Sequence, residues 1–450
     1  MMYSLPRLSR RFFLGLPAFA WTAGASAGIS TKFYTPEQFG ADPIGEKSSS
    51  IAFANMFNKA LGDGIPCICN IENAVYRFDQ PLIIKTRGKP VCFKGMGLSS
   101  TKIIIDGWFT GISIGGAEGF EARVELRDFE ITRSNYKLYD GSVGKRSIEI
   151  TWADGVTISG VKESGSIGFG IFLDRCKNYE ISHCVVTDHF TGKTHSSGTD
   201  GIHIYRSEGP GRVFGNVVHD VGDDAISFGS FTADSPTLDF ECYGNVIQDV
   251  AGSVKVYGNA KRFRIYDNQV IRPKTGGVVI YDDRGPDQSF VISNGEIFNN
   301  IVRGQIGAGI CGGIAVWSPT GDGMGSQRNI VIRNNQIEDG NFGITVASQT
   351  PHKAPMDITI KDNAIAGMRQ RGIMIDGIGG SFLIAGNEIS DTGFEGAFLG
   401  AVQTGMSIGM LDFTDNKLSN SGLLDSKRLP IKAADDAWMI TNNLINGVVR

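Results

Sequence analysis

The sequence lacks the features that mark nucleic-acid-binding and membrane-spanning proteins. Only 20% of its 450 residues are charged, and the formal net charge is −4, so it offers no basic excess for nucleic acid or anionic lipid. Beyond residue 27, no stretch reaches the roughly 18 apolar residues that a membrane-spanning helix needs. We therefore expect neither a nucleic-acid partner nor a membrane span.

Cysteine is too sparse and too scattered to form a disulfide framework. The seven cysteines are odd in number, and Cys67-x-Cys69 is too short a spacing for a zinc knuckle. The histidines also lack the spacing of metal ligands, so we predict no metal site and no cofactor. We expect buried free thiols, and leave open a single disulfide such as Cys176 with Cys184.

The N-terminus has the composition of a targeting segment. Arg10-Arg11 precede Phe12-Phe13-Leu14 and a short apolar run, and Ala25-Ser26-Ala27 provides small residues for cleavage. Paired arginines in this setting resemble the twin-arginine export signal. We predict that residues 1–27 are removed and that the mature protein is periplasmic or secreted. The alternatives are an ordinary signal peptide and a signal anchor.

Glycine is abundant, with 60 residues against 15 prolines, and short apolar strands recur between the glycines. One phrase, a small residue followed by alternating apolar positions, occurs eight times at intervals of 24 to 36 residues. A second series of strands, most of them closed by Asn, falls between these copies. The apolar anchors of the eight copies are Ile171, Ile202, Ile226, Val254, Val278, Ile314, Ile344 and Ile373.

This repeat predicts an all-β fold, a single-stranded right-handed parallel β-helix with an N-terminal capping helix. Each coil can bury its inward residues only by stacking on the next coil. Asn at a bend tolerates a left-handed backbone and can hydrogen-bond to the Asn of the neighbouring coil. A propeller or a β-sandwich would need a series of antiparallel hairpins, which the chain does not offer.

The two ends are expected to cap the solenoid. We assign residues 28–100 to the N-terminal cap and first coils, and residues 101–450 to the β-helix with its C-terminal cap. Residues 48–61 carry apolar side chains at helical spacing between a serine N-cap and Gly62. With Phe39-Gly40-Ala41 and Lys94-Gly95-Met96-Gly97, this segment resembles the N-terminal region of the pectate-lyase-3 group. Lys47-Ser48-Ser49-Ser50 stands where that group often has acidic residues.

Two neighbouring coils carry aspartates at the same point of the phrase. Asp200 and Asp224 lie 24 residues apart and hold identical positions relative to Ile202 and Ile226, while Asp223 precedes Asp224. Stacked coils would place the first two about 5 Å apart. Like charges at that distance raise at least one pKa, which gives the acid and base that glycoside hydrolysis requires. Turn residues or a structural Ca²⁺ site are the alternatives.

The two motifs resemble those of the polygalacturonases, glycoside hydrolase family 28. Thr199-Asp200-Gly201 is followed one coil later by Gly222-Asp223-Asp224-Ala225-Ile226. The resemblance implies that Asp223 is the general acid, that Asp200 and Asp224 position the attacking water, and that the anomeric carbon inverts. Ala251-Gly252-Ser253 and Val279-Ile280-Tyr281 replace the family's Gly-His-Gly and Arg-x-Lys, which hold galacturonate. We therefore expect a different sugar.

Strand parity suggests which residues contact the substrate. If the Ile and Val anchors point inward, alternate residues form one outer face with aromatic side chains suited to stacking on sugar rings, and the gap at Gly229 could admit a ring. Asp200 and Asp224 are in phase with the inward residues, so they reach solvent only if the strands start after them. The predicted substrate-binding residues are His203, Tyr205, Lys255, Tyr257, Tyr281, Asp283 and Trp317.

These observations favour a glycosidase that acts on a polysaccharide or oligosaccharide. One alternative is a lyase or uronate epimerase with Lys255 as its base, in which Ca²⁺ could serve as a cofactor. Another is a non-catalytic glycan-binding β-helix. Long intervals at Asp188–Gly198 and Asp282–Gly295 predict loops beside the site. The flank of a β-helix could pair with another copy, so a homo-oligomer stays open.

Overall fold

A computed structural model describes most of the chain. The described residues are 32–138, 145–190, 198–282, 290–306, 311–318, 326–348, 355–376, 380–393, 402–404, 410–421, 438–445 and 448–449. The predicted targeting segment, residues 1–27, lies outside them. Within the described part, no helix is long and apolar enough to cross a membrane.

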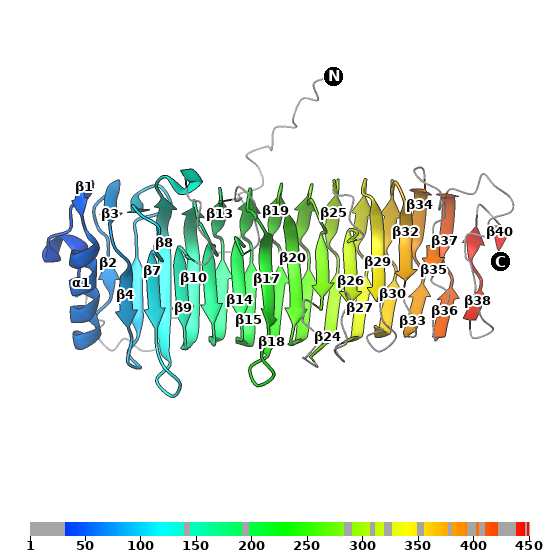
Figure 1. The fold of residues 1–450 in the computed structure, drawn as a ribbon, viewed down its shortest axis with the longest axis horizontal. Helices are drawn as coiled ribbons and strands as arrows, with labels where there is room; N and C mark the ends of the chain where they lie inside the picture. The colour runs from blue at the N-terminus through cyan, green and yellow to red at the C-terminus, as the bar shows by residue number, and fades with distance from the viewer. Residues whose placement is uncertain are drawn as a thin grey trace, which may run out of the picture.

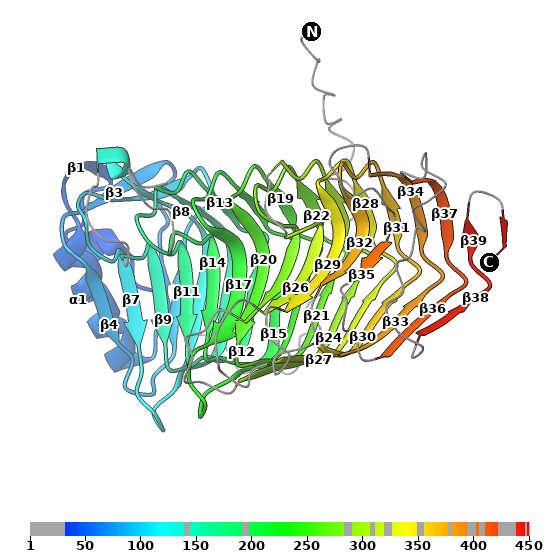
Figure 2. The ribbon, with the colours of Figure 1, turned by 45° about the vertical axis from the view of Figure 1, so that its right-hand side comes forward.

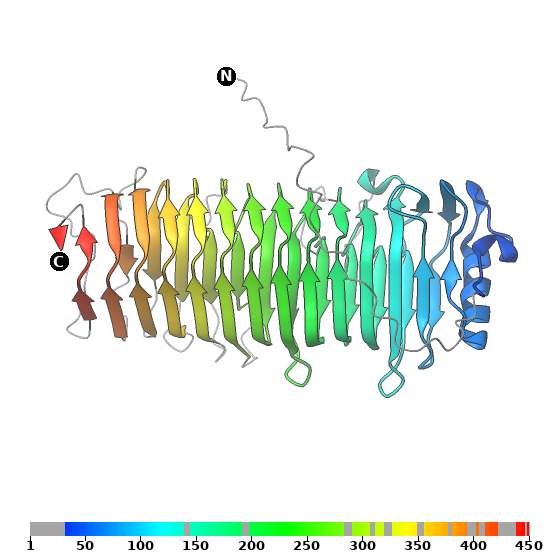
Figure 3. The same cartoon turned by 180° about the vertical axis from the view of Figure 1, so that it is seen from behind.

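The chain forms a right-handed parallel β-helix, as the repeat predicted. Its coils stack in one row, with helix α1 (Ser50–Asp63) at one end and strand β40 (Val448–Val449) at the other (Figure 1; Figure 3 from behind). Two short 3-10 helices, Pro36–Phe39 and Tyr136–Leu138, lie near the N-terminal end. Among the described strand pairs, only β39 (Leu444–Ile445) with β40 is antiparallel.

One face of the solenoid is a sheet of 12 strands, to which each coil contributes one strand. Figure 2 shows these strands side by side along that face. In stacking order they are β4 (Leu82–Lys85), β7 (Ile112–Gly115), β9 (Ile148–Thr151), β11 (Ile171–Asp174), β14 (Ile202–Tyr205), β17 (Asp224–Ser230), β20 (Gly252–Gly258), β23 (Val278–Tyr281), β26 (Ile314–Ser318), β29 (Phe342–Ser348), β32 (Arg371–Asp376) and β35 (Val402–Thr404).

The rest of each coil belongs to a sheet of 28 strands. Its N-terminal strands are β1 (Ile44–Ser48), β2 (Cys67–Ile68), β3 (Ala74–Phe78), β5 (Val91–Lys94), β6 (Thr101–Ile105), β8 (Ala122–Arg133) and β10 (Ala153–Ser164). From there each coil adds a pair of consecutive strands. The pairs are β12 (Lys177–Ser182) and β13 (Val185–Thr187), β15 (Glu208–Phe214) and β16 (Val217–His219), β18 (Thr237–Tyr243) and β19 (Val246–Gln248), β21 (Ala260–Tyr266) and β22 (Gln269–Ile271), β24 (Val291–Phe298) and β25 (Ile301–Arg303), β27 (Ser326–Arg333) and β28 (Gln336–Glu338), β30 (Met356–Lys361) and β31 (Ala364–Ala366), β33 (Ser381–Ala385) and β34 (Glu388–Thr392), β36 (Met410–Thr414) and β37 (Lys417–Ser421), and finally β38 (Trp438–Thr441) and β39.

The capping helix forms because its apolar residues recur at helical spacing. Phe53 and Met56 are fully buried against the first coils, and the Phe53 ring lies 5.0 Å from the Tyr76 ring. The sequence predicted that the helix ends at Gly62, which is two residues too early. The helix continues to Asp63 and ends at Gly64, whose positive φ of 69° suits a residue without a side chain.

Nine buried asparagines form a ladder at the bends of the strand pairs from β15–β16 to β38–β39. The side-chain amide of each of the first eight donates to the side-chain oxygen of the next asparagine at 2.9–3.0 Å, and that oxygen also accepts the backbone N–H of the donating asparagine, as Asn245 Oδ1 does from Asn216. The predicted contact between asparagines of neighbouring coils is therefore confirmed. The members are Asn216, Asn245, Asn268, Asn300, Asn335, Asn363, Asn387, Asn416 and Asn443.

The left-handed backbone falls on the residue before the ladder asparagine, and in three bends that residue is itself an asparagine: Asn299, Asn334 and Asn442. In the strand-pair bends, the residue before the ladder asparagine has positive φ, for example Asp267 at 55° and Gly244 at 61°. The ladder asparagines themselves are not left-handed. Their side chains must point inward to bond along the stack, so the tight turn falls to the exposed neighbour.

The seven cysteines are all free thiols, and five of them are buried. Cys176 and Cys184 are not paired with each other. They are buried at opposite ends of β12, and each thiol lies against a backbone carbonyl. Burial raises the pKa of both thiols to about 12, so neither is a reactive thiolate at neutral pH.

Removing one rung of the ladder should destabilise the stack. Asn300→Ala deletes the bonds from Asn268 and to Asn335, and leaves buried amide groups without partners. We expect the free energy of unfolding to fall by about 2–4 kcal/mol, measured by urea denaturation. Gln269→Ala, which truncates an exposed amide in a neighbouring coil, is the control and should change little. Equal effects of the two variants would contradict a structural role for the ladder.

Candidate active site

Three aspartates meet on the outer face of the 12-stranded sheet. Asp200 precedes β14, Asp223 precedes β17, and Asp224 is the first residue of β17. One carboxylate oxygen of each lies within 4.8 Å of the others. The parallel register brings them together, because Ile202 pairs with Ile226 and so aligns the residues before them.

Parity left open whether Asp200 and Asp224 reach solvent. The structure places both carboxylates on the outer side of the sheet, but only 3% of the Asp200 surface is exposed. The Asp200 carboxylate bonds to outward residues of β14 and β17, and the Asp224 carboxylate lies against outward Lys255 of β20. For Asp200 the expected reason holds, since β14 starts only at Ile202. For Asp224 the expected reason fails, because β17 starts at Asp224 itself and not after it. Its carboxylate nevertheless contacts Lys255 on the outer face.

Asp200 is the most buried of the three, with 3% of its surface exposed. The His203 Nδ1–H donates to Asp200 Oδ2 at 2.7 Å, and the Ser227 hydroxyl donates to the same oxygen at 2.5 Å. Burial by itself raises the pKa of Asp200, but the hydrogen bond and charge of His203, with help from Ser227 and Lys255, lower it below its usual value. Asp200 is therefore a carboxylate at neutral pH.

Asp224 has the opposite character. Burial, together with the charges of Asp200 and Asp223, raises the pKa of Asp224 to about 7. Lys255 opposes this shift, since its Nζ lies 3.4 Å from Asp224 Oδ2, but it does not offset burial and the two neighbouring carboxylates together. The cluster thus pairs an ionised carboxylate with a carboxyl group that holds a proton near neutral pH.

Gly252 makes room for the Asp224 carboxyl group. A Cβ at position 252 would lie 2.1 Å from Asp224 Oδ1, far inside contact distance. The register places Gly252 directly beside Asp224 in the next coil. Gly252, which stands where the polygalacturonase motif Gly-His-Gly has its histidine, is therefore needed for packing against Asp224 in this chain.

Asp223 completes the cluster from the turn before β17. Its Oδ2 accepts the backbone N–H of Gly198 at 2.7 Å, so the segment preceding β14 is tied to the segment preceding β17. Two loops were predicted beside the site, and residues 191–197 of the first and 283–289 of the second lie outside the described residues. The predicted substrate-binding residue Asp283 is one of these.

The predicted aromatic row exists in register but is only partly open. Tyr205, Gly229, Tyr257, Tyr281 and Trp317 follow one another across β14, β17, β20, β23 and β26. Three of the four aromatic residues are half-buried, but Tyr257 is only 4% exposed. Its ring fills the predicted gap, because a Cβ at Gly229 would lie 2.5 Å from that ring. The expectation that Gly229 admits a sugar ring is wrong.

His203 and Tyr257 support the site rather than facing a ligand. The Tyr257 hydroxyl lies 2.7 Å from His203 Nε2, which makes a chain of hydrogen bonds from Tyr257 through His203 to Asp200. A charged His203 donates from Nε2 to the Tyr257 oxygen, whereas a neutral His203 with its proton on Nδ1 accepts from the Tyr257 hydroxyl. His203 also stacks on Phe169 with ring centroids 4.2 Å apart. Sequence parity placed His203 and Tyr257 on the outer face but could not show that they contact each other.

Lys255 is a neighbour of two tyrosine rings as well as of Asp224. Its Nζ lies 5.6 Å from the Tyr257 ring centroid and 5.2 Å from that of Tyr281. Contacts with two ring faces and with the Asp224 carboxyl group suit an ammonium group, which can bind a substrate oxygen or balance the charge of the aspartates.

Sequence reasoning missed a buried ion pair directly behind Asp200. His189 and Glu163 are both fully buried, with His189 Nε2 2.5 Å from Glu163 Oε2. The Ser147 hydroxyl donates to the other Glu163 oxygen at 2.6 Å, and His189 Nδ1–H donates to the Thr199 carbonyl at 3.2 Å. Burial lowers the pKa of His189, but Glu163 and the Thr199 carbonyl raise it more, so the net shift is upward. The pair holds the backbone that leads into Asp200.

Comparisons with known proteins support the fold. No family model matches the sequence, and no curated protein matches it. Among solved structures, a thermostable GH87 α-1,3-glucanase from Streptomyces thermodiastaticus is similar at 16% identity, with TM-score 0.64 and coverage of 90% of this chain and 72% of that chain. An exopolygalacturonase from Thermotoga maritima has 12% identity, TM-score 0.56 and coverage of 82% and 93%. The A-module of a mannuronan C-5 epimerase from Azotobacter vinelandii has 16% identity, TM-score 0.52 and coverage of 91% and 100%.

The ion pair gives a prediction for stability. His189→Leu leaves the Glu163 carboxylate buried without its partner, so the free energy of unfolding should fall by about 3–5 kcal/mol in urea denaturation. The double variant Glu163→Leu/His189→Leu removes both charges and should lose less than His189→Leu alone. A double variant that is as unstable as the sum of the two single variants would show that the groups do not act as a pair.

Proposed function

We propose that this protein is a glycoside hydrolase that cleaves a polysaccharide or oligosaccharide at the aspartate cluster. One observation carries the proposal: three carboxyl groups lie within 4.8 Å, one with its pKa lowered and one with its pKa raised to about 7. Glycoside hydrolysis needs such a pair, one group to protonate the leaving oxygen and one to act as a carboxylate. The α-1,3-glucanase and exopolygalacturonase with the same fold are consistent with this reaction class.

In the proposed mechanism, Asp224 is the general acid. It holds the proton near neutral pH, and the Asp223 carboxylate activates the attacking water. Asp200, fixed by His203 and Ser227, supplies the negative charge that keeps the Asp224 proton in place. This differs from the polygalacturonase resemblance, which assigns the acid to Asp223.

We propose inversion at the anomeric carbon. Only 3% of the Asp200 surface is exposed, which disfavours direct attack on a sugar by this carboxylate and favours attack by water. The carboxylate oxygens lie closer together than the roughly 6.5–9.5 Å common among inverting enzymes, so the configuration of the first product, read by NMR, decides the point.

The lyase and epimerase alternative is weaker because its base would be Lys255. Lys255 Nζ already contacts Asp224 Oδ2 at 3.4 Å and lies over the Tyr257 and Tyr281 rings, so it is not free to approach a sugar proton. The same ammonium occupies an oxygen of the cluster that Ca²⁺ would need. We therefore propose a reaction that needs no metal.

A panel of neutral and uronate polysaccharides tests the function. We expect new reducing ends without unsaturated, ultraviolet-absorbing ends, and activity that withstands EDTA. Unsaturated ends or loss of activity with EDTA would favour the lyase, and unchanged glycans across the panel would favour a non-catalytic binder.

Aspartate variants test the roles on the glycan that the panel identifies. Asp224→Asn should lower kcat on the polysaccharide by at least about a hundredfold, because a missing general acid costs that much. It should retain most activity on an aryl glycoside of the same sugar, whose leaving group needs no proton. Asp200→Asn should lose activity on both substrates. If Asp223→Asn, and not Asp224→Asn, keeps the aryl glycoside activity, the acid is Asp223.

The pH profile gives an independent check. The protonated form of Asp224 is required, so kcat/KM should fall about tenfold per pH unit above a pKa of about 7. Lys255 lowers the pKa of Asp224, so Lys255→Met should move this descending limb to higher pH. A profile that stays flat through neutral pH, or a limb that moves to lower pH in Lys255→Met, would contradict Asp224 as the acid.

A further inference from the structure

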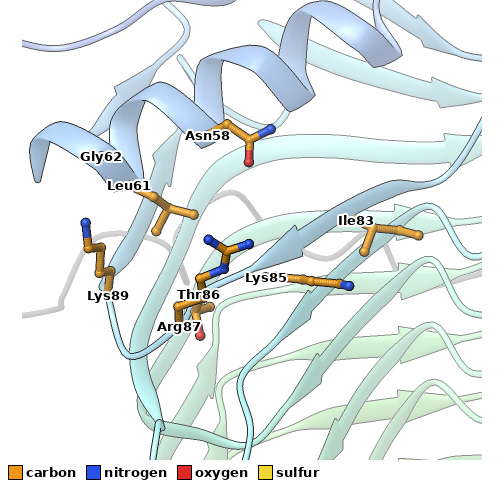
Figure 4. Close-up of a pocket in the computed structure, with 8 residues that line it drawn as sticks. All are labelled: Asn58, Leu61, Gly62, Ile83, Lys85, Thr86, Arg87 and Lys89. Carbon is orange, nitrogen blue, oxygen red and sulfur yellow. The ribbon is translucent and has the colours of Figure 1, made fainter.

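A second candidate site lies at the N-terminal end of the same face. A cavity of about 310 Å³ opens between helix α1 and strand β4. Figure 4 shows the Arg87 guanidinium between the helix and the strand that carries Lys85. The lining residues, which define the N-terminal pocket, are Asn58, Leu61, Gly62, Ile83, Lys85, Thr86, Arg87 and Lys89.

The N-terminal pocket continues onto the outer face of β4 and β7. A neighbouring cavity of about 600 Å³ shares Ile83, Lys85 and Arg87 with it. Gly115, Gly116 and Phe120 also line this cavity, and 63% of the Phe120 surface is exposed. An exposed aromatic ring in such a lining suits the apolar face of a sugar.

Lys85 and Arg87 differ from most cations of the molecule because they have no carboxylate partner among the described residues. On the 28-stranded sheet, cations pair with acids of neighbouring coils, as Arg264 does with Glu241 at 3.0 Å. Lys89 interacts electrostatically with Asp63, which already bonds to Tyr34 and Lys59. The positive charge of the N-terminal pocket is therefore available to a ligand.

The N-terminal pocket shares its strand row with the aspartate site. Lys85 pairs in register with Gly115, then Thr151, Asp174 and Tyr205. Four steps separate β4 from β14, or about 19 Å at the spacing of neighbouring strands. A glycan that lies along the solenoid axis can reach both places.

We propose that the N-terminal pocket binds an acidic sugar, such as a uronate, in the same glycan chain that the aspartate site acts on. The carboxylate binds Lys85 and Arg87, and the sugar ring stacks on Phe120. The glycan class rests on the proposed function, whereas the preference for an acidic sugar rests on the N-terminal pocket alone. The polymer thus carries its acid groups away from the bond that is cleaved.

Binding measurements on the full chain test this site separately from catalysis. The background is Asp224→Asn, which prevents digestion, and the probes are alginate, polygalacturonate and neutral dextran in affinity electrophoresis. We expect at least one acidic probe to bind more tightly than dextran. Lys85→Ala/Arg87→Ala should weaken that binding by about tenfold or more, and Phe120→Ala should weaken it as well.

The matched control is Lys94→Ala/Arg123→Ala, which removes the same charge from exposed positions of the 28-stranded sheet. It should leave binding unchanged. Equal losses in the two double variants, no preference over dextran, or unaltered binding in Lys85→Ala/Arg87→Ala would each overturn the proposal. If inorganic phosphate competes with the probe and Phe120→Ala has no effect, the N-terminal pocket binds anions in general. This result would also overturn the proposal of an acidic-sugar site. Hydrolysis retained in Asp224→Asn would refute only the catalytic assignment.

Discussion

The parallel hydrogen-bond register between successive coils is the constraint on which the rest of this molecule depends. It sets residues of neighbouring coils side by side at a fixed spacing of about 4.8 Å, whatever their distance in the chain. The buried asparagine ladder holds that register, since each rung bonds to both the side chain and the backbone of the adjacent coil. Asp200 and Asp224 meet because the coils are locked in this way, and so do Gly252 and the Asp224 carboxyl group that it accommodates.

Most of the fold could be predicted because the register is written as a repeat. Inward Ile and Val anchors and the asparagine bends are visible in the sequence, and each has a direct physical reading. The deviations are local. The helix ends at Gly64 rather than Gly62, and the left-handed residue precedes the ladder asparagine. In both cases several residues satisfy the local rule, and packing against the neighbouring coil decides among them.

The site was predictable only where its residues follow the strand period. Asp200, Asp224, His203 and Lys255 were found by their positions in successive coils. The burial of Tyr257 was not, because a tyrosine beside glycine can either face solvent or lie over the glycine. The His189–Glu163 pair was missed because neither residue belongs to the repeated phrase. Two ionisable groups 26 residues apart show no pattern until one coil closes on the next.

The capping helix has a consequence for association between molecules. A stack of parallel coils presents unpaired backbone groups at both ends, and any copy of the chain could extend it. At the N-terminal end, α1 places Phe53 and Met56 over the core. At the other end, the antiparallel β40 runs against the direction that a further parallel coil would need. The same regularity that builds the solenoid would otherwise make it a fibre, and these two irregular elements are what give it a finite length.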